Sequence, residues 1–440
     1  MKTTMNIIYA TFAVFVLAYF AFSSTAQAVL PSPTPDGFYP GGNTAEGKDA
    51  LFNLELGAQF NTAIGFQALF RNTTGFWNTA NGAGALHENI GGAFNTATGV
   101  NALRENQTGS HNTATGTAAL RKNMNGFWNT ADGSGALHEN IDGPYNTATG
   151  VNALFSNTSG EKNSAFGAGA LQNNITGRLN VANGTAALYH NTTGDANTGN
   201  GFTALYKNTE GSSNVATGAN ALEENTTGDN NTAIGTSALG NNKTGRDNTA
   251  LGGGAGDGVT TANNVICINA HGANVSDSTF IGNIRGVTTQ NADAIPVLVD
   301  SAGQLGTASS SRRYKTDIKR IDKASEWILG LKPVSFRYKV HKDCKPQFGL
   351  IAEEVAEVNP DLVIYDRDGK PYTVRYDAVN ALLLNEFLKE HQKMEEQGAT
   401  IARQQKQIEA LDKGLQKVSA QIEVSRPAPQ IVGNKGKEEP

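Results

Sequence analysis

The apolar residues of this chain recur in a fixed seventeen-residue pattern from residue 43 to residue 258. Each copy begins with asparagine, and alanine follows two and seven residues later, with leucine eight residues later, in nearly every copy. Glycine stands four residues after the asparagine, and a second asparagine and glycine stand eleven and fourteen residues after it in the first eleven copies. A frayed copy at Asn43 precedes twelve regular ones, which begin at Asn61, Asn78, Asn95, Asn112, Asn129, Asn146, Asn163, Asn180, Asn197, Asn214, Asn231 and Asn248.

A repeat of this length predicts stacked coils, because one coil with two alanines and a leucine buries too little surface to be stable alone. The two asparagine positions predict ladders in which each amide bonds to its counterpart one coil away. The glycines suit turns that need a positive φ or close backbone approach. We therefore expect a mainly β protein, a β-solenoid or β-roll with a narrow core and a short strand near N-T-A-x-G. The A-L-x-x-N part is compatible with a second strand or with a single helical turn.

The pattern changes after the repeat. Residues 259–308 alternate apolar and polar side chains and predict a β-rich connector. Residues 309–380 predict a small α/β domain: "KASEWILGL" has helical spacing, "PVSFRYKV" alternates as a strand does, "FGLIAEEVAEV" is a strand that runs into a helix, and "LVIYDRDGKPYTVRYD" is a hairpin with an Asp-Gly turn.

A helix and coiled coil are predicted over residues 381–424, followed by a disordered tail at 425–440. Apolar residues recur every seven positions along this helix, and two further apolar residues complete an a/d pattern in its last part. The seam consists of Phe387, Met394, Ile401, Ile408, Leu411, Leu415, Val418 and Ile422. Such a seam predicts association with other helices of the same kind.

The N-terminus has the features of an export signal. Lys2 precedes an apolar run from Ile7 to Phe22, and small residues around Ala26 to Ala28 offer a cleavage site. We expect a signal peptide over residues 1–28 and a Pro-rich linker over residues 29–42, with no stable membrane span after cleavage. An uncleaved N-terminal anchor is the alternative. Either reading places the protein outside the cytoplasm, secreted or at the cell surface.

Composition excludes several classes of function. The formal net charge of −5 is not clustered into a basic surface, so we expect no nucleic-acid partner. Cys267 and Cys344 lie in different regions and in no metal-ligand spacing, so we expect no metal and no cofactor, and a disulfide cannot be deduced.

Two features of the repeat suggest ligands. Aromatic pairs recur fifty-one residues apart, at Phe76 and Trp77 and again at Phe127 and Trp128, and they would either contact a surface glycan or cover a turn. A threonine array would be a flat face for ordering ice or a polysaccharide, but it breaks at Ser164, Val181 and Val215. The array consists of Thr62, Thr79, Thr96, Thr113, Thr130 and Thr147.

The segment "SSSRRYK" offers a nucleophile and a base five residues apart, Ser310 and Lys315. A serine hydroxyl is a weak nucleophile until a neighbouring base takes its proton. A lysine can be that base only when burial or a nearby cation lowers its pKa from about 10.4 toward neutrality. Arg312 and Arg313 would supply such a cation. The alternative is a serine-rich hinge beside a basic strand.

This segment and the motifs after it resemble the self-cleaving intramolecular chaperone domain of phage endosialidase tail spikes and other tail fibres. The resemblance covers roughly residues 308–395 and rests on "SSRRYKTDI", "ILGLKPVSFRYK", "FGLIAEEVAEVNPDLV" and "TVRYDAVNALLLNEFLKEH". It implies that the domain assembles three chains and that a Ser/Lys dyad then cuts the chain before the serine.

The family motif Ser-Asp-x-Arg-Leu-Lys places the nucleophile at Ser310 and the base at Lys315, with the cut between Ser309 and Ser310. This chain departs from the motif in two places, with Ser311 for the aspartate and Tyr314 for the leucine. The missing carboxylate bears on the predicted peptidase activity and not on the predicted fold.

The repeat is similar in style to the heads of trimeric autotransporter adhesins, which also use short Asn/Thr/Ala/Gly coils. Together the two resemblances imply an exported homotrimeric fibre or adhesin whose last domain directs assembly and cuts itself off as a single-turnover serine peptidase. The alternative is a structural or adhesive fibre that keeps an inactive assembly domain.

Overall fold

The computed structural model describes residues 39, 41–55, 57–291, 293–339 and 345–426. The predicted signal peptide, most of the predicted linker, Cys344 and nearly all of the predicted tail lie outside the described residues. The chain divides into two compact units, Met1–Ala292 and Asp293–Pro440.

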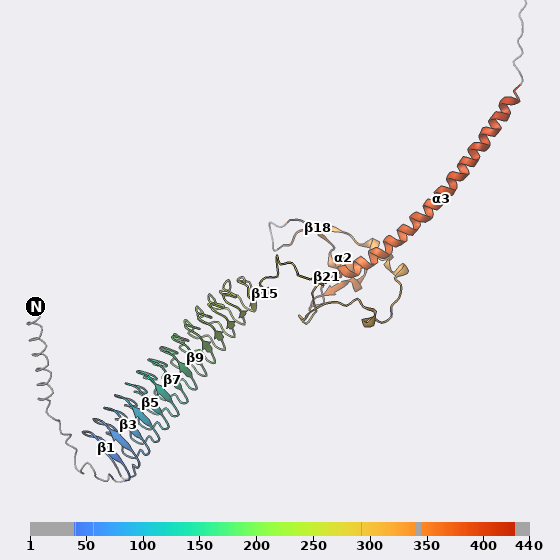
Figure 1. The fold of residues 1–440 in the computed structure, drawn as a ribbon. Helices are drawn as coiled ribbons and strands as arrows, with labels where there is room; N and C mark the ends of the chain where they lie inside the picture. Colours follow the sequence, from blue (N-terminus) through green and yellow to red (C-terminus); the bar gives the residue numbers. More distant parts are fainter. Residues whose placement is uncertain (1–38, 40, 56, 292, 340–344, 427–440) are drawn as a thin grey trace, which may run out of the picture. The chain divides into compact units, whose positions relative to one another are not determined.

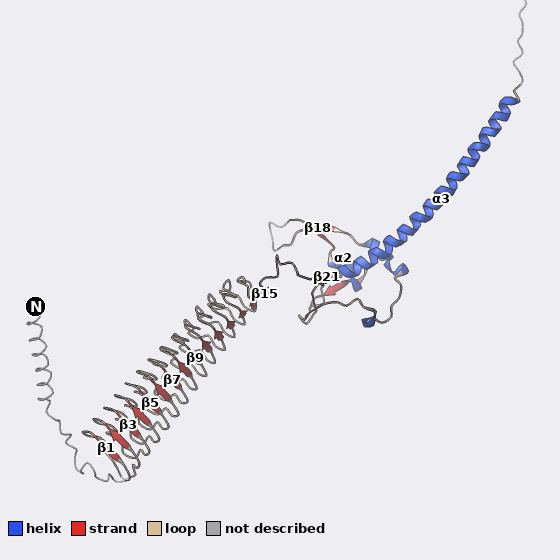
Figure 2. Ribbon diagram, viewed as in Figure 1, coloured by secondary structure: helices blue, strands red, loops and turns tan. Residues whose placement is uncertain are grey.

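The first unit is a β-solenoid, as the repeat predicts. Its single sheet has fifteen parallel strands in chain order, one from each coil, and Figures 1 and 2 show them stacked in that order. The strands are β1 (Thr44–Glu46), β2 (Thr62–Ile64), β3 (Thr79–Asn81), β4 (Thr96–Thr98), β5 (Thr113–Thr115), β6 (Thr130–Asp132), β7 (Thr147–Thr149), β8 (Ser164–Phe166), β9 (Val181–Asn183), β10 (Thr198–Asn200), β11 (Val215–Thr217), β12 (Thr232–Ile234), β13 (Thr249–Leu251), β14 (Val265–Ile268) and β15 (Ser278–Ile281).

The strands pair in the register of the repeat, so each residue lies opposite its equivalent in the next coil. Ala63 pairs with Ala80, for example, seventeen residues on. The sheet also continues beyond residue 258, where the repeat ends, through β14 and β15. The last step is shorter, since Ile266 pairs with Thr279.

The core is as narrow as the repeat implies. In the coil that begins at Asn129, the strand alanine Ala131 and the pair Ala136 and Leu137 are completely buried, and equivalent residues are buried in nearly every other coil. One leucine side chain contributes about 1.5–3 kcal/mol when it is fully buried. A single coil therefore gains little, and stability depends on the stack.

The A-L-x-x-N part is neither a strand nor a helical turn but two consecutive tight turns. The amide of Ala68 donates to the carbonyl of Gly65, and the amide of Asn72 donates to the carbonyl of Leu69. Leu69 has a φ of 50°, in the left-handed region that a branched side chain rarely adopts. Its burial and the 2.9 Å bond from its amide to Ala85 in the next coil hold this conformation.

The glycine four residues after each asparagine is required by backbone contact between coils. A Cβ atom on Gly116 would lie 2.6 Å from the carbonyl oxygen of Gly133, and Gly116 has a φ of 127°. Both facts exclude a larger residue. These glycines therefore provide both the positive φ and the close backbone approach that the sequence suggests as alternatives.

The predicted asparagine ladders are present at both positions. The side-chain amide of Asn78 donates to the Oδ1 of Asn61 at 3.1 Å and to the carbonyl of Gly92 at 2.8 Å. In the second ladder, the amide of Asn89 donates to the Oδ1 of Asn72 at 2.6 Å. These asparagines are buried, so the ladders satisfy backbone carbonyls at the corners of the coil that water cannot reach.

The second unit contains short elements and one long helix. In chain order they are the hairpin β16 (Leu298–Val299) and β17 (Leu305–Gly306), the 3-10 helices η1 (Arg312–Tyr314) and η2 (Asp322–Gly330), the pair β18 (Val334–Phe336) and β19 (Gln347–Gly349), the helix α2 (Ala352–Val358), the 3-10 helix η3 (Pro360–Leu362), the hairpin β20 (Val363–Tyr365) and β21 (Pro371–Val374), and the helix α3 (Tyr376–Val424).

These elements follow the α/β pattern of the sequence, with one difference. The segment "KASEWILGL" forms a 3-10 helix instead of an α-helix. The core of this unit is small: Ile328, Val355, Leu362, Val363, Val374 and Val379. Among the described residues, the structure has no helix both long and apolar enough to cross a membrane.

Candidate active site

A single turn of 3-10 helix brings the predicted nucleophile and base together. Ser311 accepts a backbone hydrogen bond from Tyr314, and Arg312 accepts one from Lys315, which together form η1. The turn folds Lys315 back toward Ser310, and its Nζ donates a hydrogen bond of 3.1 Å to the Ser310 Oγ. The five-residue spacing in the sequence is therefore the three residues of this turn with Ser310 and Ser311 before them and Lys315 after them.

The three serines of this segment have different partners. The Ser309 hydroxyl accepts a 3.3 Å hydrogen bond from the amide of Ser311. Ser311 begins η1, and its side chain makes no capping bond there. Of the three, Ser310 is the one whose hydroxyl contacts Lys315 among the described residues.

Arg313, one of the two arginines in this segment, contacts an aromatic ring. The Arg313 guanidinium lies 4.9 Å from the centre of the Tyr314 ring, a cation–π contact. Tyr314 stands where the motif has leucine, and its ring contacts Arg313, the arginine of the same motif. Arg313 is therefore directed toward Tyr314.

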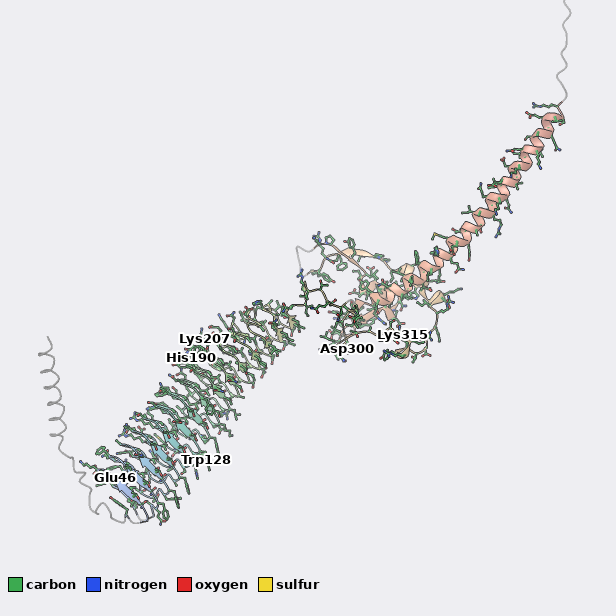
Figure 3. The ribbon with its side chains drawn as sticks, in the orientation of Figure 1. Glu46, Trp128, His190, Lys207, Asp300 and Lys315 are labelled. Atoms are coloured by element: carbon green, nitrogen blue, oxygen red, sulfur yellow. The ribbon has the colours of Figure 1, made fainter. Side chains whose placement is uncertain are left out.

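The pair is open to solvent in the single chain. Ser310 and Lys315 are both exposed, and Lys315 can be found on the surface in Figure 3. A lysine acts as the base of such a pair only where it is shielded from water. The arrangement has the geometry of a dyad but lacks the enclosure that would activate it.

A second polar cluster, which sequence reasoning missed, joins η2 to α3. Ser325 is completely buried, and its hydroxyl bonds to the carboxylate of Glu386. The hydroxyl also accepts from the Asn385 amide at 2.7 Å and from the Lys389 Nζ at 3.3 Å. Lys389 donates to Glu386 at 2.7 Å as well. Every polar group is satisfied, which is typical of a structural junction.

This junction predicts a pH dependence. The hydrogen bond from Lys389, followed by that from Ser325, holds the pKa of Glu386 below its ordinary value of 4.5. A lowered pKa stabilises the folded state above the ordinary value, and the contribution is lost as the pH falls through the folded pKa. We expect acidification below about pH 4 to weaken the hydrogen-exchange protection of η2 amides. In Glu386→Gln this loss should be absent, and an identical loss in both proteins would contradict the assignment.

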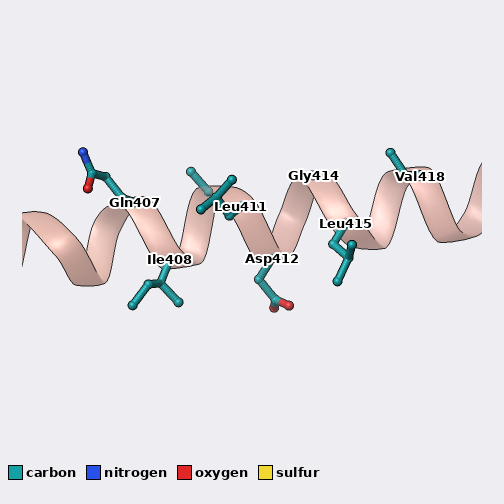
Figure 4. Close-up of a pocket in the computed structure, with 8 residues that line it drawn as sticks. Gln407, Ile408, Leu411, Asp412, Gly414, Leu415 and Val418 are labelled. Carbon is teal, nitrogen blue, oxygen red and sulfur yellow. The ribbon is translucent and has the colours of Figure 1, made fainter.

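The exposed side of α3 carries an apolar groove. Its lining includes Ile408, Leu411, Leu415 and Val418, the a and d residues of the predicted seam (Figure 4). These side chains remain more than half exposed in the single chain. Among the described residues there is no group of three or more His, Cys, Asp or Glu side chains that would hold a metal ion.

Comparison with known proteins identifies the segment that contains the dyad. Residues 310–364 match the family described as chaperone of endosialidase. The match begins at Ser310 and ends within β20, so it covers part of the 308–395 resemblance and leaves α3 outside. No curated protein and no solved structure matches the chain. The chain thus combines a β-solenoid with a following segment that is similar to the chaperone-of-endosialidase family.

Proposed function

We propose that this protein is an exported homotrimeric fibre whose C-terminal chaperone domain directs assembly and then cuts itself off between Ser309 and Ser310. The observation that carries the proposal is the 3.1 Å contact between Lys315 and Ser310, in a segment whose family match begins at that serine. The other polar cluster with a serine and a lysine, around Ser325, is buried and saturated with hydrogen bonds, so it offers no free nucleophile.

The proposed reaction uses the peptide bond that precedes the nucleophile. The Oγ of Ser310 attacks the carbonyl carbon of Ser309, and Lys315 takes the hydroxyl proton. The C–N bond then breaks, the amide nitrogen of Ser310 gains a proton, and the Ser309 carbonyl is left as an ester on Ser310. Water hydrolyses this ester, which frees the hydroxyl and leaves a carboxylate on Ser309. The products are a solenoid fragment that ends at Ser309 and a fragment that begins at Ser310.

Assembly would activate the dyad. The second unit buries few residues by itself, and it exposes large apolar side chains such as Phe348, Tyr372 and Leu329. Packing of three copies through the α3 seam would cover such surface and exclude water from the segment around Lys315. Burial favours the neutral, basic form of a lysine. Cutting would then follow correct assembly and not precede it.

The second candidate is a fibre with an inactive assembly domain, and one residue favours it. Ser311 stands where the family motif has aspartate, so a carboxylate next to the nucleophile is missing. The fold and the seam do not depend on that carboxylate. In this reading the chain assembles in the same way and stays whole.

A glycan ligand is proposed with less support. Trp77 stacks on Phe60 at 4.6 Å, and Trp128 stacks on His111 at 4.2 Å. A sugar ring packs on the face of an aromatic ring, and one face of each of these indoles is stacked on a ring of the preceding coil. The contacts favour the alternative in which the aromatics cover the corner of the coil and stabilise the stack.

The link between assembly and cutting can be tested on the seam. Leu411→Asp would place three like charges in the coiled coil of a trimer, so we expect this variant to be a monomer by analytical ultracentrifugation. Because cutting depends on assembly in this proposal, the monomer should stay uncut on a denaturing gel. Lys406→Asp, at a position outside the seam in the preceding heptad, should remain trimeric and cut. A monomeric Leu411→Asp protein that still cuts would contradict the coupling, and a monomeric natural chain would contradict the proposed function itself.

A further inference from the structure

The outer face of the solenoid sheet is almost free of charge. In each strand from β2 to β13 the first and third residues point outward, and in β14 and β15 the second and fourth do so. Asp132 is the one ionisable residue at these outward positions from β2 to β15. Charged residues lie instead on the turns, where neighbouring coils pair them, as Arg71 does with Glu88 and Lys122 with Glu139.

This face is mixed along most of the sheet, where Ile64 and Phe166 stand among polar residues, and it becomes continuously aliphatic at the C-terminal end. Residues at the third position of β3 to β7 are polar: Asn81, Thr98, Thr115, Asp132 and Thr149. In β12 to β15 the equivalent residues are all large and aliphatic, and the register places them in one continuous row with a fifth residue, Ile266, beside it. We call these five residues the aliphatic ladder: Ile234, Leu251, Ile266, Ile268 and Ile281.

The aliphatic ladder is uncovered in the single chain. Its side chains keep between 39% and 49% of their surface exposed, although they lie on adjacent rungs about 4.8 Å apart. Scattered exposed aliphatics are ordinary, whereas these five residues form one contiguous row. Exposure continues after the sheet, since Ile284 and Val287 are exposed by more than 60%.

We propose that the aliphatic ladder packs against the same ladder in the other copies of this chain. This inference rests on the proposed trimer and names the solenoid surface that takes part in it. In three parallel copies related by a three-fold axis, identical residues face one another beside the axis, so a charge there would lie close to the same charge in the other copies. An uncharged, aliphatic row avoids that repulsion and suits a second copy as its occupant.

The size of the ladder decides how it can be tested. Four strands about 4.8 Å apart and three residues wide, at about 3.3 Å per residue, cover roughly 150–200 Å². A stable interface needs about 800 Å² on each partner, so the ladder is one part of a longer contact. A single substitution there need not dissociate the trimer, and the readout must be local.

Cysteine cross-linking supplies such a readout. We expect Leu251→Cys, in the full chain with Ser310→Ala to keep its length constant, to form covalent dimers on oxidation, seen at twice the chain mass on a non-reducing denaturing gel. The parent with its natural cysteines, and Thr244→Cys on an exposed turn of the preceding coil, should give few dimers.

Sedimentation of the same proteins separates the two ways in which the inference can fail. A trimer in which Leu251→Cys forms no more dimer than Thr244→Cys would overturn the ladder while the proposed assembly stands. A monomer would overturn both. A trimer with dimers specific to Leu251→Cys supports the ladder as the contact between copies.

Discussion

Ser310→Ala is expected to leave the chain full length, because it removes the oxygen that attacks the Ser309 carbonyl. Lys315→Ala keeps the nucleophile but removes the group 3.1 Å away that would take its proton. General bases accelerate such steps by about 10²–10⁴-fold, so the lysine variant should cut at least a hundredfold more slowly. Both residues are exposed and outside the core, so both variants should fold and form trimers.

Neighbouring serines provide matched controls. Ser309→Ala and Ser311→Ala should still cut, because neither hydroxyl contacts Lys315. A denaturing gel of the assembled proteins gives the result directly. Loss of cutting in Ser311→Ala, or its persistence in Ser310→Ala, would show that the nucleophile is wrongly assigned. If the natural trimer stays whole and Ser311→Asp cuts, the missing carboxylate has made this chain an assembly module only.

Leu137→Asp is expected to unfold a large part of the solenoid. Leu137 is completely buried, and a carboxylate there would lie in an apolar core without a partner, at a cost of several kcal/mol. Because coils are stable only against their neighbours, the damage should spread along the stack. The midpoint of thermal unfolding should fall, and proteolysis should cut within several coils.

Ser134→Asp is the control for the charge itself, since Ser134 belongs to the same coil and is exposed. It should unfold like the natural chain. Equal unfolding temperatures for Leu137→Asp and Ser134→Asp would mean that the leucine row does not form the core.

The sequence predicts the solenoid well because every coil repeats the same requirements. The buried residues equivalent to Asn78 and Leu86 recur in nearly every unit, so a prediction made for one coil applies to the others. The conformation of the turns does not follow from the sequence, because a leucine at positive φ is contrary to its local backbone preference. Contacts with the next coil hold the leucine in this conformation. The sheet also extends into β14 and β15, whose alternation predicts strands but not their place in the stack.

The second unit likewise contains one polar contact that the sequence predicts and one polar cluster that it does not. The contact between Ser310 and Lys315 is local, so five-residue spacing and a motif suffice to predict it. The cluster at Ser325 joins residues that lie sixty or more positions apart, and nothing in the chain marks Glu386 or Lys389 as its partners. Such a contact follows from packing of η2 on α3, which the sequence pattern does not reveal.

The intact mass and the N-terminal sequence of the assembled natural protein show directly whether this chain assembles and then cuts itself before Ser310. We expect two fragments, with the smaller one beginning Ser-Ser-Arg-Arg and extending from residue 310. A trimer that contains only uncut chains, or a small fragment that begins at any other residue, would contradict it.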